Sequence, residues 1–384
     1  MSIKILNVSH PNADAWIAFD EKEGFDYYYG GTRMVPPATA EPDVVRIVSR
    51  LMSEESEFKN RLINKVLTQE TFAAYNGRMP EGFLGSKVGG ARCILRPRDE
   101  KIYATLQNPA NPDFDATISG IFERLGGLLN EHGGMVKLTP DFGRYAGMAD
   151  ILARFTTHVL GIRCEAGGCG GKSSYAATGI ITALEMLGIS DYQDKPVTLI
   201  GSAGALGSDV LKYLSARGFA DLAVCDLVYD DGTSAPPPGV QKLTSKMGAL
   251  TEECLKRGGM IIATTYGEEL ENSNWKAIPP GSVLVLAHNL SVPLGSKGLS
   301  VMKGIAARNV YSVPGQVLTL GGALTSRLEW FWRKSRSHVS FDKELAHLTV
   351  REVEGHLLSK ITRLVTSFNM TPFEAMLHYA DAQG

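Results

Sequence analysis

The sequence predicts an α/β fold built from two domains and a helical C-terminal segment. After Pro196, short runs of Val, Ile and Leu alternate with helical or loop segments, which is typical of a parallel sheet covered by helices. Before Pro196, strand-like and helical segments are mixed without that alternation. We therefore place an N-terminal α/β domain at residues 1–172 and a doubly wound parallel-sheet domain at 173–320. Helices within 321–384 are expected to fold back onto the first domain.

The N-terminal domain is expected to combine strands and helices around its own core. Strand-like apolar runs cover residues 3–20 and 91–107. Apolar residues recur at helical spacing in 43–51, 116–132 and 148–160.

A glycine-rich loop at residues 161–172 ends the first domain. Ser173 or Ser174 can then cap a helix that runs to Leu187, because a serine oxygen accepts the free N–H groups of a first helical turn. Gly188 is placed to end this helix, since glycine readily adopts the left-handed conformation found after helix C-termini.

Five short apolar runs are expected to form the strands of the second domain: residues 197–201, 222–226, 260–264, 283–287 and 310–313. Helical segments are expected at 208–217 and 249–257. Further helices are expected at 345–368 and 373–379, in the C-terminal segment.

The first of these strands opens into a glycine-containing turn and then a helix, which is the arrangement of a Rossmann-type domain. The turn comprises Gly201, Ser202, Ala203, Gly204, Ala205, Leu206 and Gly207. Such a turn places helix-end N–H groups around a dinucleotide pyrophosphate. Read as G-x-G-x-x-G from residue 202, the motif has serine in its first glycine position.

Asp226 ends the next strand, about twenty residues after the turn, where Rossmann folds carry a ribose-binding carboxylate. This carboxylate accepts hydrogen bonds from the adenosine ribose and repels a 2′-phosphate, so we predict NAD as the cofactor. The alternative is a tight turn without a ligand, followed by an ordinary surface aspartate.

Composition and charge exclude several classes of protein. Hydrophobic residues make up 44% of the 384 residues, which indicates a globular chain. The 39 basic and 41 acidic residues give a net charge of −2, which argues against a nucleic-acid-binding protein. The apolar runs fall short of the ~20 residues of a membrane helix. Residues 1–10 do not resemble a signal peptide, so we expect a cytoplasmic protein.

The five cysteines are odd in number and scattered, which favours free thiols. Cys164 and Cys169 flank glycines, but no second Cys pair or His pair has the spacing of metal ligands. We therefore predict no metal site.

Three features of the first domain suit a small charged substrate. The glycine pair Gly30-Gly31 lets backbone amides approach a ligand. Lys59 can hold a carboxylate, and Asp141 can move a proton. The alternatives are structural: Lys59 lies in a charged run and would then belong to a solvated helix face, while Asp141 would only cap a helix.

Short motifs that occur in order along nearly the whole chain resemble those of the glutamate/leucine/phenylalanine/valine dehydrogenase family. They are Gly30-Gly31-Thr32-Arg33-Met34 for G-G-x-R-M, Phe58-Lys59-Asn60 for Y-K-N, Pro140-Asp141-Phe142-Gly143 for the catalytic D-x-G, Ala177-Thr178-Gly179 for the T-A-x-G helix, Ala287-His288-Asn289 for A-A-N, and Pro314 through Gly322 for P-D-Y-V-I-N-A-G-G. Two positions depart from the family: His288 replaces an alanine and Thr319 an asparagine.

The resemblance implies oxidative deamination of an L-amino acid to a 2-oxo acid, or the reverse reductive amination. Lys59 would bind the substrate carboxylate and Asp141 would shuttle a proton at the amino nitrogen. Ala287 and Asn289 would belong to the cofactor site. The family also implies an active site in the cleft between the domains. A homodimer or larger homo-oligomer built on the first domain is expected, because apolar strands there would otherwise leave an edge exposed.

The family has a second, catalytic lysine within G-G-G-K or G-G-A-K-G-G. Aligning Gly85-Ser86-Lys87 places Lys87 at that position, whereas aligning Gly89-Gly90-Ala91-Arg92 places Arg92 there. We favour Lys87 as the catalytic amine, because arginine does not lose its proton at accessible pH. If Arg92 holds the position, two alternatives gain weight: an imine reductase, or a dehydrogenase of another carboxylated metabolite. A third is a cofactor-binding partner subunit without chemistry of its own.

Overall fold

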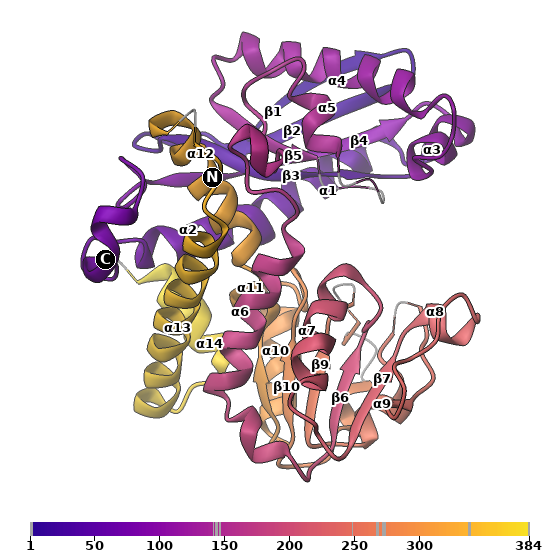
Figure 1. The fold of residues 1–384 in the computed structure, drawn as a ribbon, viewed down its shortest axis with the longest axis vertical. Coiled ribbons are helices and arrows are strands. Elements are labelled where there is room, and N and C mark those ends of the chain that lie inside the picture. Colours follow the sequence, from indigo (N-terminus) through magenta and orange to yellow (C-terminus); the bar gives the residue numbers. More distant parts are fainter. Residues whose placement is uncertain are drawn as a thin grey trace. The chain divides into compact units, whose positions relative to one another are not determined.

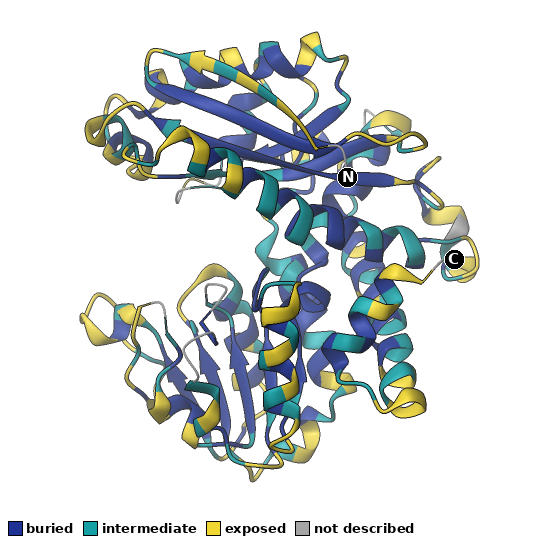
Figure 2. Ribbon diagram, turned by 180° about the vertical axis from the view of Figure 1, so that it is seen from behind, coloured by how far each residue is buried: buried dark blue, intermediate teal, exposed yellow. Residues whose placement is uncertain are grey.

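The computed structural model describes residues 3–140, 142, 145, 147–247, 249–265, 269–270, 274–336 and 339–382, apart from the side chain of Asn76. The chain divides into two compact units, the first formed by residues 1–172 and 323–346 and the second by 173–322 and 347–384. Each unit contains its own sheet and covering helices (Figure 1). In both sheets, most strand residues are buried, as Figure 2 shows in dark blue.

The C-terminal segment is shared between the units, whereas the sequence predicted that all of it would return to the first domain. Only residues 323–346 belong to the first unit. The rest joins the second unit, because α14 (Pro372–Asp381) packs against β11 (Tyr311–Val313) and α10 (Ser296–Ala306). An ion pair of 2.9 Å between Lys303 Nζ and Glu374 Oε1 strengthens this attachment.

The first unit is built on a five-stranded mixed sheet. Its strands are β1 (Ile3–His10), β2 (Ala13–Asp20), β3 (Tyr27–Met34), β4 (Val88–Pro97) and β5 (Val136–Pro140), in the order β1-β2-β4-β3-β5. β2 is antiparallel to β1 and β4, whereas β3 is parallel to both β4 and β5. β3 therefore lies between β4 and β5, and its side chains have neighbours on both sides.

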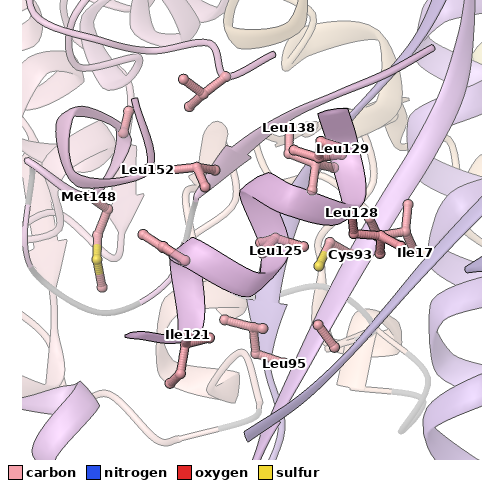
Figure 3. Close-up of a cluster of buried hydrophobic side chains, with 14 of the residues drawn as sticks. Ile17, Cys93, Leu95, Ile121, Leu125, Leu128, Leu129, Leu138, Met148 and Leu152 are labelled. Atoms are coloured by element: carbon pink, nitrogen blue, oxygen red, sulfur yellow. The ribbon is translucent and has the colours of Figure 1, made fainter. Parts of the chain in front are cut away.

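Two separate clusters of apolar side chains cover the two faces of this sheet. On one face, Ile17, Cys93 and Leu138 pack against α4 (Phe114–Glu131) and α5 (Met148–Leu152), as Figure 3 shows. On the other face, Trp16, Ala18 and Ile94 pack against Val44, Val48 and Met52 of a long helical segment. Because side chains alternate along a strand, the residues of β4 that share this second face are Gly90, Arg92, Ile94 and Arg96.

The remaining helices of the first unit are α1 (Glu41–Leu51), η1 (Met52–Glu57), α2 (Phe58–Val66), η2 (Ala73–Arg78), α3 (Glu100–Gln107), η3 (Cys164–Ala166) and most of α12 (Gly321–Ser335). Two sequence predictions for this unit were too long. The strand expected at 91–107 ends at Pro97 and a helix follows, while the helix expected at 148–160 ends at Leu152.

The second unit has a six-stranded, all-parallel sheet, which confirms the predicted doubly wound domain. Its strands are β6 (Val197–Ile200), β7 (Leu222–Cys225), β8 (Gln241–Lys242), β9 (Met260–Ala263), β10 (Val283–Leu286) and β11, in the order β11-β10-β9-β6-β7-β8. This is the strand order of dinucleotide-binding folds, in which the order reverses beside the first strand. The reversal lies between β6 and β9, so a ligand is expected at the carboxyl ends of these strands.

The helices of the second unit are α6 (Ser173–Met186), η4 (Ile189–Tyr192), α7 (Ala205–Ser215), α8 (Leu227–Asp230), α9 (Glu252–Lys256), η5 (Asn274–Ala277), α10, α11 (Gly315–Leu318), α14 and most of α13 (Lys343–Phe368). All five cysteines are free thiols. Among the described residues, no helix has the length and apolarity needed to cross a membrane, and no group of three or more His, Cys, Asp or Glu could hold a metal.

Candidate active site

A run of charged residues in the first unit is buried against the sheet. α1, η1 and α2 follow one another without a break, and η1 is a π-helical turn, a feature frequent at functional sites. Glu55, Glu57 and Lys59 are only 4%, 5% and 6% exposed. The interpretation of this run as a solvated helix face therefore does not hold for these three residues.

Glu55 lies at the centre of a cluster of positive charges. Its Oε1 accepts a hydrogen bond from Arg92 Nη1, and its Oε2 one from Arg33 Nη2, each at 3.1 Å. Burial alone would raise the pKa of Glu55, but the positive charges of Arg92, Arg33 and Lys59 outweigh burial and lower it to about 2. Glu55 is therefore ionised at neutral pH, and three cations share its charge.

Arg92 is the buried arginine of β4, with its side chain 4% exposed. Its Nε and Nη2 atoms have no hydrogen-bond partner among the described residues. The neighbouring strands carry small residues beside it: Ala18 of β2 pairs with Arg92, and the pairs Tyr29–Gly90 and Thr32–Cys93 place Gly31 of β3 level with it.

Lys87 lies outside this cluster. It immediately precedes β4, its side chain is exposed, and its main chain exchanges hydrogen bonds with Asp26. Arg92 is five positions further along the chain, a distance of about 17 Å in an extended strand. The predicted role of Lys87 requires a buried amine, whereas the side chain of Lys87 is exposed.

The two glycines of the motif in β3 have different surroundings. A Cβ atom at Gly30 would lie 1.6 Å from the carbonyl oxygen of Ala91, so this glycine is required for the close approach of β4. Gly31 is half-buried and is paired with Thr139 of β5. Gly31 lies between Thr139 and Arg92 on the sheet and carries no side chain there. It is therefore a better candidate for substrate contact than Gly30.

Tyr29, just before the glycine pair, connects three polar groups that the sequence did not single out. Its hydroxyl donates to Ser326 Oγ at 2.8 Å and lies 3.0 Å from Thr139 Oγ1. Lys172 Nζ donates to the same hydroxyl at 2.6 Å. The signal for Lys172 was its place at the end of the glycine-rich loop, whereas nothing in the sequence pointed to Tyr29 or Glu55.

Asp141, the predicted proton shuttle, lies outside the described residues. The strand before it ends at Pro140, which is paired with Thr32 of β3.

The glycine turn of the second unit has the geometry expected of a phosphate-binding turn. Gly201 has a φ of 80°, and a Cβ at Gly207 would lie 2.0 Å from the carbonyl oxygen of Gly201. Both positions therefore require glycine, one for its conformation and one for close helix–strand packing. A Cβ at Gly204 would lie 3.5 Å from its nearest neighbour, an ordinary contact.

The rest of the turn divides into one buried residue and several accessible ones. Ser202 is fully buried, and its hydroxyl donates to Tyr229 Oη at 3.2 Å, so it is structural. Ala203, Gly204 and Ala205 are exposed and Leu206 is half-buried. No described side chain caps α7, so the N–H groups of its first turn are free for an anion.

The carboxylate of Asp226 is hydrogen-bonded to this turn. Its Oδ2 accepts the N–H of Ala203 at 2.9 Å, and its Oδ1 accepts the N–H of Val228 at 3.3 Å, capping α8. The carboxylate is therefore fixed at the carboxyl end of β7, beside the turn.

The residues after β10 are largely packed. Ala287 is fully buried and Asn289 half-buried, and a Cβ at Gly315 would lie 1.8 Å from the His288 carbonyl oxygen. Burial lowers the pKa of His288 to about 4, so its ring is neutral at neutral pH. The hydroxyl of Thr319 donates to the Gly315 carbonyl at 2.8 Å, which gives it a structural role.

Comparison with known proteins supports the fold through structure alone. No protein-family model matches the chain, and no curated protein matches it in sequence. L-tryptophan dehydrogenase from Nostoc punctiforme is similar over 99% of this chain and 94% of its own, with 15% identity and a TM-score of 0.61. Leucine-bound hetero-hexameric glutamate dehydrogenase from Thermus thermophilus is similar over 98% and 87%, with 14% identity and a TM-score of 0.67. Glutamate dehydrogenase from Peptoniphilus asaccharolyticus is similar over 98% and 88%, with 12% identity and a TM-score of 0.62. The chain therefore has the fold of amino acid dehydrogenases.

Proposed function

We propose that this chain is an NAD-dependent amino acid dehydrogenase, a divergent member of the glutamate/leucine/phenylalanine/valine dehydrogenase family. It would convert an L-amino acid to a 2-oxo acid, or catalyse the reverse reductive amination. The observation that carries this proposal is a buried cluster of cations around Glu55 in the same chain as an uncapped glycine turn. The first suits a carboxylate and the second a pyrophosphate.

The second unit supplies the groups expected to hold NAD. The first turn of α7, from Ala205 to Gly207, offers free N–H groups to the pyrophosphate. Asp226 accepts two backbone N–H groups, and a carboxylate with about four acceptor sites retains capacity for ribose hydroxyls. When bound, the cofactor supplies the hydride acceptor, and the protein positions it.

The first unit supplies the groups expected to hold the amino acid. Lys59 is buried among the charges of the Glu55 cluster, where its ammonium attracts a carboxylate. Gly31 has no side chain on the face of β3 that it shares with Arg92 and Thr139, and the substrate backbone is proposed to lie there. Asp141, which follows β5, is proposed to exchange a proton with the amino nitrogen.

Lys172 is a stronger candidate than Lys87 for the amine that activates water. It lies 2.6 Å from the Tyr29 hydroxyl, and Tyr29 is two residues from Gly31. Lys87 immediately precedes β4, and its side chain is exposed. Lys172→Ala should therefore remove turnover and spare NAD binding, whereas Lys87→Ala should leave both unchanged. The opposite pattern would restore the sequence prediction for Lys87.

Turnover of a panel of L-amino acids with NAD, followed by NADH absorbance, tests the proposal. Saturable NADH formation with one class of side chain is the expected result. If no amino acid reacts, NADH oxidation should be measured with 2-oxo acids and ammonia, and then with preformed imines.

Arg92 favours a second candidate, the imine reductase, since arginine cannot activate water for imine hydrolysis. Turnover of a preformed imine without any amino acid activity would support it. NADH binding without turnover of any substrate would support the non-catalytic partner subunit.

We also propose that the protein assembles as a homodimer or larger homo-oligomer through the first unit. β1 is an edge strand of that sheet, and its residues Ile3 and Ile5 are 38% and 36% exposed. An exposed apolar edge is a pairing site for another chain. Light scattering at micromolar concentration should give at least twice the chain mass, and a monomeric mass would contradict the proposal.

A further inference from the structure

Arg92 is a buried cation with unused hydrogen-bonding capacity. Of its three nitrogens, only Nη1 has a partner among the described residues, the carboxylate of Glu55 at 3.1 Å. Leaving buried N–H groups without an acceptor is costly, and more so on a charged group. Among the described residues, the surroundings of Arg92 therefore lack an acceptor for these two nitrogens.

The two unused nitrogens lie on one edge of the guanidinium group. The Nε–H and one N–H of Nη2 point the same way, at the spacing of the two oxygens of a carboxylate. Glu55 binds at Nη1 and so fixes the plane of the group without occupying this edge. A carboxylate satisfies both donors at once through its two oxygens and adds an opposite charge.

The neighbours of Arg92 on the sheet are small and the local charge is positive. Ala18 and Gly31 flank it on the two adjacent strands. Three cations, Arg92, Arg33 and Lys59, act on the carboxylate of Glu55. An incoming anion gains from both features.

We propose that Arg92 binds the carboxylate of the substrate in a bidentate contact through Nε and Nη2, with Glu55 as the residue that positions it. Lys59 adds charge from the adjacent helix. The inference rests on the proposed function for the class of substrate, a 2-oxo or 2-amino acid. In the alignment that places Arg92 at the family's catalytic lysine, this residue becomes a binding group, and proton transfer must come from elsewhere.

Oxamate and oxamide provide a direct test that needs no turnover. The two molecules have nearly the same shape, but only oxamate carries a carboxylate. Calorimetric titration of the full chain, with and without NADH, should show saturable binding of oxamate and none of oxamide. Arg92→Lys keeps a positive charge beside Glu55 but cannot donate the two parallel hydrogen bonds of a bidentate contact. It should weaken oxamate binding about tenfold. Arg92→Gln should weaken it roughly a hundredfold.

Arg96→Gln is the matched control. Arg96 lies on the same face of the same strand, but its guanidinium is already bonded to Asp14 Oδ2 at 2.8 Å and the Thr39 carbonyl at 3.2 Å. This variant should bind oxamate as the unmodified protein does. Because the Arg92 variants risk misfolding, a crystal of the unmodified protein soaked in oxamate gives a second measurement, with the carboxylate expected at Nε and Nη2.

Three results would each overturn the inference: no saturable oxamate binding, equal affinity of Arg92→Lys and the unmodified protein, or a soaked crystal without the carboxylate at Nε and Nη2. These outcomes are independent of the proposed function. Oxamate binding through Arg92 without amino acid turnover would retain the inference and reject the dehydrogenase. Amino acid turnover without oxamate binding through Arg92 would retain the dehydrogenase and reject the inference.

Discussion

The glycine turn of the second unit and the charged face of the first unit are built on opposite principles. In the turn, Gly201 and Gly207 are fixed by backbone conformation and packing, and the binding groups are main-chain N–H groups. On the charged face, Glu55, Lys59 and Arg92 are buried ionised side chains whose balance depends on one another. Main-chain N–H groups suit any nucleotide pyrophosphate, whereas an arrangement of buried charged side chains suits a particular small anion.

Because of this difference, the two sites are sensitive to different substitutions. A backbone site is damaged when a side chain is added where none fits, and it is insensitive to pH. A site made of buried charges is damaged when one partner is removed, because the remaining charge is left without compensation. Substitutions at the two sites should therefore differ in how they change stability, its pH dependence and ligand binding.

The largest effect on catalysis is expected at Asp141, if the first unit carries the acid–base chemistry. Asp141→Asn should lower kcat by a factor of roughly 10²–10⁴, the usual contribution of a general acid–base group. Thermal melting and NAD affinity should stay unchanged, because the groups that we propose for the cofactor belong to the second unit. Full activity of the Asn variant would reduce Asp141 to a helix cap.

Removal of the central charge should show the interdependence of the buried ions. Glu55 has a pKa of about 2 in the folded protein against an ordinary value of 4.5. It therefore contributes stability that is fully present above about pH 4.5, on the order of 3 kcal/mol, and that is lost as the pH falls toward 2. Glu55→Gln should lower the free energy of unfolding by about this amount at pH 7.

Urea unfolding at pH 7 and pH 3 checks both the size and the sign of this effect. The difference between Glu55→Gln and the unmodified protein should shrink to about 1 kcal/mol at pH 3, since much of the linkage is already lost there. Glu54→Gln is the control, because Glu54 is half-buried and makes only a 3.5 Å ion pair with Arg50. A difference that is independent of pH would mean that Glu55 contributes through packing and not through its charge.

The backbone design of the turn predicts a contrast between two glycines three residues apart. A Cβ at Gly207 would overlap the Gly201 carbonyl oxygen at 2.0 Å, whereas one at Gly204 would meet it at 3.5 Å. Gly207→Ala should lower stability by about 1–3 kcal/mol and weaken NAD binding. Gly204→Ala should leave stability nearly unchanged. Equal melting temperatures for the two variants would show that the turn rearranges without cost.

The same contrast explains how far the sequence could be read. The turn, its strands and Asp226 are contiguous or separated by regular spacing, so local pattern was sufficient to predict them. The two-residue strand Gln241–Lys242 was missed because it is exposed and has no apolar run. The strand Tyr27–Met34 was noticed only for its glycine motif, since Gly-Gly is unusual inside a strand.

The charged face was only half predicted, for a physical reason. Lys59 was identified from a motif, but its burial follows from a π-helical turn that composition does not reveal. Arg33, Glu55 and Arg92 come from three separate elements, and their ion pairs depend on strand order. The choice between Lys87 and Arg92 could not be made from glycine spacing, because both follow glycines and only the register of β3 and β4 distinguishes them.

The smallest expected effect concerns Asp226, the charged residue of the second unit that we propose for the cofactor site. Asp226 is predicted to favour NAD, because its carboxylate would repel the 2′-phosphate of NADP. Asp226→Asn removes the charge and keeps one acceptor oxygen, for the Val228 N–H or the Ala203 N–H, while the other oxygen becomes an NH2 donor. It should weaken NAD binding by about 1 kcal/mol, since charged hydrogen bonds to the ribose become neutral ones, and bind NADP more tightly than before. Affinities for both cofactors, measured by fluorescence titration, test this. If the unmodified protein prefers NADP, or if the substitution leaves the ratio of the two affinities unchanged, Asp226 serves only to cap α8 and to hold the turn.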